Sequence, residues 1–223
     1  MNFKKLAYKT EWIEYPDIEG HCKKLGIEPT TFFKDGRPPL YTLPAIHDLS
    51  TGVKMADSQP IVEYLEKTYP EAPTLFPHNT LGLQTAFEQA YIQNSDAIRP
   101  FFIPSVWERL NPPSQEYFRR TREARIGKKL EDWVPQGEDR ERQWALVKNH
   151  FDQVEAWYSK NGGTGPFLMG ETVTWADLVV AGSTLWLKII WGENHPYWKE
   201  IEAWHGSRWK KLIDALEIYS VVV

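Results

Sequence analysis

Residues 41–58 read YTLPAIHDLSTGVKMADS, and this stretch decides the fold of the first part of the chain. Tyr41–His47 is a strand-like run with a proline inside it, and the turn-forming residues Asp48–Gly52 follow. Val53–Ala56 then reads as a returning strand, so the stretch predicts a β-hairpin. Ser58 comes directly after the hairpin, where its side chain can cap the N-terminus of a helix.

The elements around the hairpin give an alternating pattern of strand and helix. Thr10–Tyr15 is rich in β-forming residues, and Pro16–Leu25 reads as a helix that Gly26 ends. The helix that begins at Ser58 should end before Pro70, and one of its faces carries Ile61, Tyr64, Leu65 and Thr68. This part of the chain therefore has the predicted order β-α-β-β-α.

Beyond residue 77 the sequence changes to the 3.6-residue periodicity of helices. Helical patterns cover residues 79–110, 114–132, 138–160 and 174–189, and a tryptophan-rich tail continues to about residue 217. Pro100 and Pro104 should kink or break the first pattern, and Asn111-Pro112-Pro113 should end it. We therefore expect an α+β fold with two domains, residues 1–77 and an all-α domain at residues 78–223.

Thr174 and Asp177 form the strongest local folding signal in the second domain. Thr174 can bond the backbone of Asp177 while the Asp177 carboxylate reaches back, and Val173 can pack against Leu178. This capping box accounts for Asp177 fully, so we expect a structural and not a catalytic role for that carboxylate.

The overall composition is that of a folded globular protein and argues against several kinds of partner. The 223 residues are 42% hydrophobic and 25% charged, with a formal net charge of −4. No run of lysine and arginine is long enough for a phosphate-binding stripe, so nucleic acid is not an expected partner. The uncharged stretch Leu178–Leu187 is about half the length of a transmembrane helix, so no membrane partner is expected.

The cysteine, histidine and glycine residues indicate the cellular compartment and argue against metal and phosphate sites. Cys22 is the single cysteine, and the charged first twenty residues leave no room for the apolar core of a signal peptide. We therefore expect a reducing compartment, the cytoplasm. The six histidines show no metal-ligand spacing, so no metal is expected. Gly162–Pro166 lacks the lysine of a phosphate-binding loop and reads as a connection between helices.

Tryptophan is unusually frequent. All but one of the 11 tryptophans lie beyond residue 100. They indicate either a bulky helical core or a pocket for flat ligands, and we expect core or interface packing for most of them.

Taken together, three features resemble a glutathione transferase: the hairpin with Leu43-Pro44, the helix start Ala56-Asp57-Ser58, and the Thr174-x-x-Asp177 box. The resemblance covers nearly the whole chain. The amino-acid sequences of residues 8–19 and 41–48 look like those of the etherase-related, fungal-specific transferases of wood-decay basidiomycetes. The resemblance implies a thioredoxin-like, glutathione-binding N-terminal domain, an all-helical C-terminal domain that lines a hydrophobic substrate site, and a homodimer.

The resemblance also implies where glutathione binds. In the family the proline that matches Pro44 is cis, and the backbone of the preceding residue, here Leu43, pairs with the cysteinyl part of glutathione. A helix N-terminus with the Ser58 hydroxyl suits a carboxylate, and the Asp57 carboxylate can pair with an ammonium group. The γ-glutamyl end of glutathione carries both groups. The alternative is that Ser58 only caps its helix and Asp57 is solvated.

Three more residues are candidates for contacts with glutathione. Thr42 would add a contact beside Leu43. Lys34 or Arg37, in the loop before the hairpin, would meet the glycine carboxylate, with ordinary surface charge as the alternative.

The chain departs from the family pattern at its beginning. The family has the order β-α-β-α-β-β-α, whereas residues 1–6 resemble the last turn of the family's first helix. In the family the first strand lies between the hairpin and the strand that matches residues 10–15. We therefore predict that a strand at residues 10–15 is poorly paired or absent. The chain is either an incomplete version of a normal enzyme, which we favour, or a genuine short form.

The residue that activates the glutathione thiol has no match in this sequence. In the family a Ser, Tyr or Cys after the first strand donates a hydrogen bond that lowers the thiol pKa. Cys22 lies in mid-helix and not at the family's position, while Tyr8 and Tyr15 are expected to pack beside the strand. The catalytic residue therefore stays unassigned.

Three functions fit these observations. The leading hypothesis is a transferase that adds glutathione to small aromatic or hydrophobic electrophiles, or cleaves aryl ethers with it. The alternative is a non-catalytic, ligandin-type binder of aromatic compounds, which fits the missing thiol-activating residue. A regulatory or structural dimer would bind neither glutathione nor aromatic ligands.

Overall fold

The computed structural model describes residues 1–34 and 36–222, which fall into two units. The first unit consists of Met1, Phe3–Pro73 and Asn111–Phe118, and the second of Asn2, Thr74–Leu110 and the chain from Arg119 onward. In chain order the helices and strands are α1 (Ile18–Leu25), β1 (Ala45–His47), β2 (Lys54–Ala56), α2 (Ser58–Thr68), α3 (Leu81–Gln93), α4 (Arg99–Arg109), α5 (Pro112–Ile126), α6 (Gly137–Tyr158), α7 (Trp175–Trp191) and α8 (Pro196–Leu216). Short 3₁₀ helices lie at Tyr15–Asp17, Pro77–Asn79, Asp96–Ile98, Glu131–Trp133, Ser159–Asn161 and Glu217–Tyr219.

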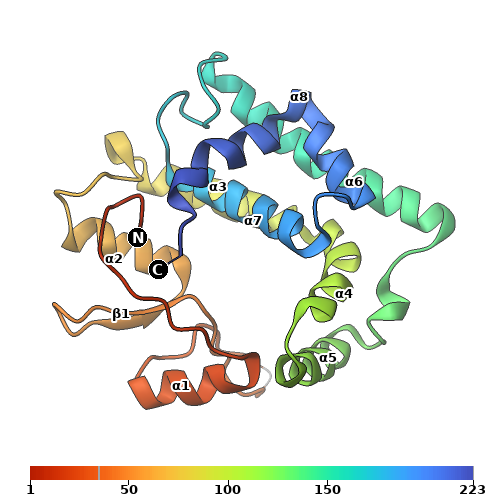
Figure 1. Cartoon of the computed structure of the whole chain (residues 1–223), viewed down its shortest axis with the longest axis horizontal. Coiled ribbons are helices and arrows are strands. Elements are labelled where there is room, and N and C mark those ends of the chain that lie inside the picture. Colours follow the sequence, from red (N-terminus) through yellow and green to blue (C-terminus); the bar gives the residue numbers. More distant parts are fainter. Residues whose placement is uncertain (35, 223) are drawn as a thin grey trace. The chain divides into compact units, whose positions relative to one another are not determined.

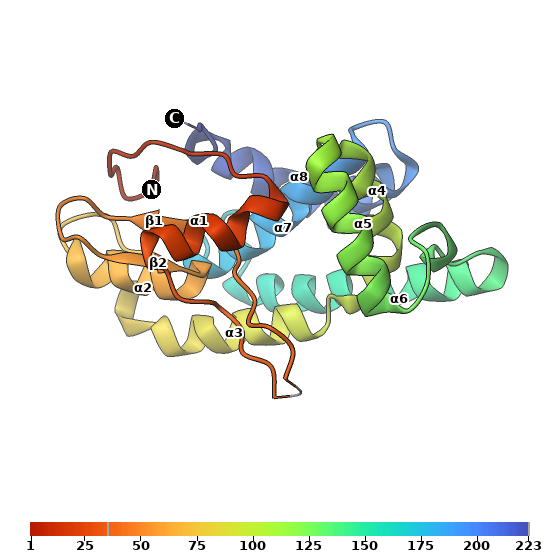
Figure 2. The same ribbon diagram turned by 90° about the horizontal axis from the view of Figure 1, so that it is seen from below.

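The first unit is built around the predicted β-hairpin, which is shorter than the sequence pattern indicated. β1 and β2 pair in antiparallel register, with Ala45 opposite Ala56 and His47 opposite Lys54. The hairpin lies between α1 and α2 (Figures 1 and 2). The prediction of a hairpin that leads directly into a helix is confirmed.

The two predicted helices of the first unit are also confirmed. α1 follows a 3₁₀ turn and ends at Gly26, whose φ of 72° is one that glycine adopts without strain. α2 covers the predicted residues 58–68 and buries Ile61, Val62 and Leu65 on one face. The helix therefore presents a narrow apolar stripe to the hairpin.

No strand forms at residues 10–14 within the part of the chain that the structure describes, and Tyr15 begins a 3₁₀ helix. The prediction that this strand is absent or poorly paired is confirmed. Other contacts hold the segment instead. The Glu14 carboxylate accepts hydrogen bonds from Asn111 Nδ2, at 2.6 Å, and from the Ser114 hydroxyl. Together, led by the Ser114 bond, they hold the pKa of Glu14 below its usual value.

In the second unit, prolines shape the helices close to where the sequence indicated. The first helical pattern is broken before Pro100 and not at it, since α3 ends at Gln93 and Pro100 occupies the first turn of α4. In that turn the missing N–H of proline costs no helical hydrogen bond. Pro104 is accommodated inside α4, which ends before Pro112 begins α5.

α7 packs against α3, α4 and α8 (Figure 1). Its first turn carries the predicted capping box, in which Asp177 Oδ2 accepts a hydrogen bond from the Thr174 N–H at 2.8 Å. Gln84 of α3 links the two helices further, because its Oε1 accepts from the Ala176 N–H at 2.9 Å. The predicted structural role of Asp177 is confirmed.

Most of the late tryptophans lie in ring clusters of the second unit. Trp198 and Trp209 are at most 1% exposed, and the Phe151 ring lies 5.3 Å from the Trp209 ring. Trp186 differs, because 45% of its surface is exposed. Core packing therefore accounts for the buried indoles, whereas the Trp186 ring lies partly at the surface.

Candidate functional site

The register of the hairpin brings the main predicted site residues together. One step beyond the pair formed by Ala45 and Ala56, the Asp57 N–H donates to the Pro44 carbonyl over 3.0 Å. Because an antiparallel ladder brings successive residues opposite one another, Leu43 and Ser58 follow at the same end of the hairpin. The structure thus gathers these four candidates from two separate parts of the sequence.

Leu43 offers backbone groups that a peptide ligand can use. The Leu43–Pro44 bond is cis, as the resemblance implied. Leu43 is 41% exposed, and no described residue hydrogen-bonds to its N–H or carbonyl. An exposed N–H and C=O pair at the end of a strand can bond to an extended peptide as an added strand does.

Asp57, and not Ser58, is the N-cap residue of α2. This corrects the prediction that Ser58 caps the helix, since Ser58 is the first helical residue and the Asp57 carbonyl accepts from the Ile61 N–H at 3.1 Å. The Asp57 side chain is exposed and forms no hydrogen bond with the described residues. Its φ of 80° and ψ of 131° lie where non-glycine residues are strained by about 1–3 kcal/mol. Such strain at an exposed carboxylate is typical of a functional site.

Ser58 presents two donors at the start of α2. Neither its hydroxyl nor its N–H is bonded to another of the described residues. The N-terminus of a helix carries a partial positive charge and favours anions. Ser58 can therefore hold a carboxylate while Asp57 holds an ammonium group, so the pair suits a ligand that carries both.

The three further candidates have different surroundings. Thr42 lies beside Leu43 in the chain, but its Oγ1 is 2.9 Å from the Thr30 Oγ1 and is already hydrogen-bonded. Lys34 is exposed, and no hydrogen bond or ion pair joins it to the described residues. The Arg37 guanidinium lies over the Phe33 ring, 4.1 Å from its centroid.

Cys22 is buried, and the Tyr15 ring packs against other aromatic rings. Cys22 is 1% exposed on α1, and burial raises the pKa of its thiol, which reduces the thiolate fraction. Tyr15 packs on Tyr117 and Phe118, with ring centroids 6.4 and 5.6 Å away, so its expected packing role is confirmed. Tyr8 is partly buried in the segment before Tyr15.

Sequence reasoning missed a polar network that fixes the tip of the hairpin to α2. The Asp48 carboxylate accepts hydrogen bonds from the Tyr64 and Tyr69 hydroxyls, each at 2.6 Å, and from the Ser50 N–H at 2.9 Å. These bonds, led by that of Tyr64, hold the pKa of Asp48 well below its usual range. The spacing Asp48-x-Ser50 is an Asx-turn signal, but nothing in the sequence pairs it with the tyrosines. The network therefore joins the tip of the hairpin to the C-terminal half of α2.

The described residues also bear on metal binding and on membrane insertion. No group of three or more His, Cys, Asp or Glu side chains there could hold a metal ion. None of the helices in that part of the chain combines the length and apolar character needed to cross a membrane.

The sequence matches two family models, the N-terminal domain of glutathione S-transferases over residues 1–73 and the C-terminal domain over residues 82–219. The chain belongs to the glutathione S-transferase family. The first match ends at Pro73, where the first unit of this glutathione S-transferase gives way to the second. The chain is thus a transferase with a thioredoxin-like N-terminal domain and an all-helical C-terminal domain.

Solved structures of fungal glutathione S-transferases are similar over the whole chain. CsGST63524 of Ceriporiopsis subvermispora, in complex with glutathione, is 42% identical with a TM-score of 0.93, and the match covers 100% of this chain and 88% of that one. GSTFuA3 of Phanerochaete chrysosporium is 40% identical with a TM-score of 0.89, covering 100% of this chain and 87% of that one. These similarities confirm the resemblance to transferases of wood-decay basidiomycetes.

A curated relative comes from another fungus. The glutathione S-transferase-like protein ustS of Aspergillus flavus is 32% identical in an alignment of 229 positions that covers 93% of this chain and 79% of that protein.

Proposed function

We propose that this glutathione S-transferase binds glutathione at the end of the hairpin and transfers it to small aromatic or hydrophobic electrophiles, by conjugation or by ether cleavage. The observation that carries the proposal is the set of unused polar groups at Leu43, Asp57 and Ser58. Their chemistry complements a peptide that has an amino acid end group. The similar CsGST63524, which was solved in complex with glutathione, supports the same ligand.

Each residue of the site has its own role in this proposal. The N–H and carbonyl of Leu43, which precedes Pro44, pair with the cysteinyl part of glutathione. The Ser58 N–H and hydroxyl hold the γ-glutamyl carboxylate, and the Asp57 carboxylate holds the ammonium group. Thr42 and Lys34 make outer contacts, with Lys34 directed to the glycine carboxylate.

The electrophile is assigned to the helical domain, with domain bounds of 1–77 and 78–223. Trp186 of α7 is half-exposed and meets the Phe102 ring of α4 edge to face, with centroids 4.4 Å apart. Ile189, one turn along α7 from Trp186, is 62% exposed. Exposed apolar groups beside an aromatic edge favour flat hydrophobic ligands.

A ligandin-type binder of aromatic compounds is the second candidate function. It is favoured by the burial of Cys22 and by the packing of Tyr15, which leave the thiol-activating residue unassigned. Such a binder would hold glutathione and aromatic ligands without turnover.

We also propose that the protein is a homodimer. Because it has a single cysteine, we propose a location in the cytoplasm.

Calorimetric titration with glutathione tests the binding site. Ser58→Ala should weaken binding about tenfold or more, because a hydrogen bond to a charged group contributes about 1.5–3 kcal/mol. Ser159→Ala is the matched control, since that hydroxyl only caps the end of α6 by donating to the Ala156 carbonyl. Equal affinity in wild type and Ser58→Ala would contradict the assigned site.

Turnover of a chloronitrobenzene with glutathione separates the two functions. Product formation that saturates with glutathione supports the transferase. Saturable binding of glutathione and of the aromatic compound without product supports the ligandin-type binder.

A further inference from the structure

A second candidate site lies in the helical unit, apart from the hairpin. A hollow of about 330 Å³ is lined by Gly165, Pro166, His205, Arg208 and Lys211. Ligand sites commonly measure about 300–1,000 Å³, so the hollow can hold a small molecule. Its lining includes two basic side chains, Arg208 and Lys211, and no acidic residue.

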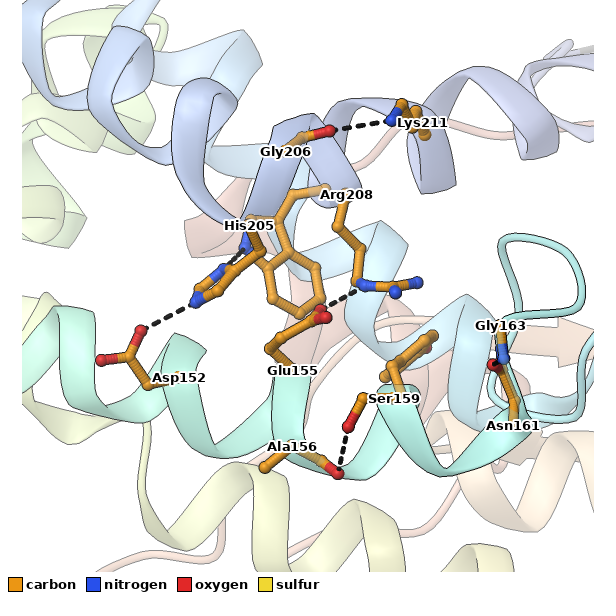
Figure 3. A network of polar contacts seen from close by, with 12 residues as sticks. Asp152, Glu155, Ala156, Ser159, Asn161, Gly163, His205, Gly206, Arg208 and Lys211 are labelled. Atoms are coloured by element: carbon orange, nitrogen blue, oxygen red, sulfur yellow. Dashed lines mark hydrogen bonds and ion pairs between the residues drawn. The ribbon is translucent and has the colours of Figure 1, made fainter.

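An interruption of α8 builds one wall of the hollow. His205, Gly206 and Ser207 have φ values of 53°, 65° and 61°, so the helix is broken there. The Gly206 carbonyl accepts a hydrogen bond from Lys211 Nζ at 2.8 Å (Figure 3). This bond holds the ammonium group at the hollow, and two of its three N–H groups have no partner among the described residues.

Arg208 supplies the second cation. Its Nε forms an ion pair with Glu155 Oε2, and Figure 3 shows the two terminal nitrogens turned away from that carboxylate. No described residue hydrogen-bonds to those terminal nitrogens. A guanidinium whose two terminal N–H groups are unused presents a fork that matches two oxygens of an oxyanion.

His205 forms part of the wall and is not a ligand. Its Nδ1 accepts from the Trp209 indole N–H at 3.1 Å, and its Nε2 lies 2.7 Å from Asp152 Oδ1. Because Nδ1 accepts, Nε2 carries the proton and donates to Asp152. Both ring nitrogens are therefore used, and Asp152 is itself engaged by this ring and by Lys148.

The opposite wall is fixed by the loop after α6. Asn161 Nδ2 donates to the Phe167 carbonyl at 2.7 Å, and the Gly163 N–H donates to Asn161 Oδ1 at 2.8 Å. A Cβ at Gly165 would lie 2.5 Å from the Gly170 carbonyl, so that position is closely packed. The Glu171 carboxylate lies beside Gly165 and opposes a negative ligand.

We propose that this hollow binds the phosphate group of a small molecule, with the Arg208 fork and the Lys211 ammonium as its ligands. Glu155 pairs with Arg208 and Glu171 lies beside Gly165, so two nearby carboxylates offset the two cations, and the attraction for phosphate depends on the unused N–H donors of Arg208 and Lys211. A phosphate group carries about −1.5 to −2 charges and three terminal oxygens. Two of these oxygens can accept from the Arg208 fork and the third is left for the Lys211 ammonium, whereas a carboxylate has only two oxygens.

Calorimetric titration with inorganic phosphate and with phenyl phosphate, at constant ionic strength, tests the proposal. Lys211→Gln should weaken phosphate binding about tenfold or more, because it removes a charged donor. Lys210→Gln is the matched control, since Lys210 pairs with Asp214 on the same helix. Arg208→Lys keeps a cation for Glu155 but removes the fork, so it should also weaken binding.

The outcomes distinguish a phosphate monoester from free phosphate, and they distinguish binding at the hollow from binding at the hairpin site. Tighter binding of phenyl phosphate assigns the hollow to a phosphate monoester, and equal binding assigns it to free phosphate. Glu171→Gln should tighten both. Glutathione affinity should be unchanged in Lys211→Gln, which makes this proposal independent of the hairpin site. No saturable binding in wild type, or equal weakening in Lys210→Gln and Lys211→Gln, would overturn it.

Discussion

The Tyr158 hydroxyl donates a hydrogen bond to Asp177 Oδ1 over 2.9 Å and so joins the last residue of α6 to the first turn of α7. The Leu168 N–H donates to the same oxygen at 2.8 Å, while the Thr174 N–H and hydroxyl both donate to Oδ2. Asp177 is 0% exposed. Burial raises the pKa of its carboxyl, and the four donors oppose that shift. One side chain thus organises a capping box, a loop and a helix end.

Asp177→Ala is expected to lower the free energy of unfolding by at least about 3 kcal/mol, because it leaves buried donors without their acceptor. Urea denaturation measures the loss. Asp214→Ala is the control, since its exposed ion pair with Lys210 should contribute less than about 1 kcal/mol. A loss in Asp177→Ala no larger than that of the control would contradict the role of Asp177.

Substitutions at Asp57 should separate backbone strain from ligand binding. Asp57→Gly and Asp57→Ala both remove the carboxylate, so each should weaken glutathione binding about tenfold or more. Only glycine tolerates a φ of 80° freely, so Asp57→Gly should be more stable than Asp57→Ala by about 1 kcal/mol. Calorimetry and denaturation measure the two effects. An order of stability with alanine above glycine would show that position 57 is not strained.

His150 should make stability depend on pH. It is 7% exposed between the rings of Tyr91 and Phe151, and neither ring nitrogen has a hydrogen-bond partner in the described part of the chain. Burial lowers the pKa of His150 from 6.5 to about 4. Between these values the unfolded chain takes up a proton that the native state does not, so stability falls as the pH falls through this window.

The full effect of His150 is about 3 kcal/mol, at about 1.4 kcal/mol for each unit of pKa difference. Denaturation at pH 7 and pH 4.5 should show most of this loss in wild type. His150→Phe should lose less over the same range, because it has no proton to take up. Parallel pH profiles for the two proteins would exclude His150 as the cause.

Lys4 should tie the N-terminal segment to α2. Its Nζ lies 3.0 Å from Glu66 Oε1 and donates to the Pro73 carbonyl at 3.1 Å, and the side chain is 3% exposed. Lys4→Ala removes the cation from a mostly buried pair and should cost about 3 kcal/mol. The double variant Lys4→Met with Glu66→Leu should recover much of that loss. Lys9→Ala, at an exposed position, is the control and should leave the denaturation midpoint unchanged. Similar effects of Lys4→Ala and Lys9→Ala would contradict a stabilising role of the Lys4 ion pair.

Local sequence signals predicted the hairpin and α2 well, but not the cap between them. Two of these signals are the turn-forming run Asp48–Gly52 and the apolar face of α2. Both depend only on residues close together in the chain, so they predict the same local structure whatever the tertiary contacts are. The N-cap is Asp57 and not the predicted Ser58, because the Asp57 N–H donates to the Pro44 carbonyl across the hairpin. That bond depends on strand register, which turn propensity alone does not fix.

The sequence by itself determined the family, the hairpin, the helix at 58–68, the Thr174–Asp177 box and the candidates Leu43, Asp57 and Ser58. These depend on residues close in the chain, whose backbone preferences act before any tertiary contact forms. The tertiary structure alone decided that residues 10–14 form no strand, that Asp48 holds Tyr64 and Tyr69, and that Arg208 and Lys211 line one hollow. A strand needs a partner for its backbone groups, and a polar cluster needs side chains from distant elements, so neither can be read from local pattern.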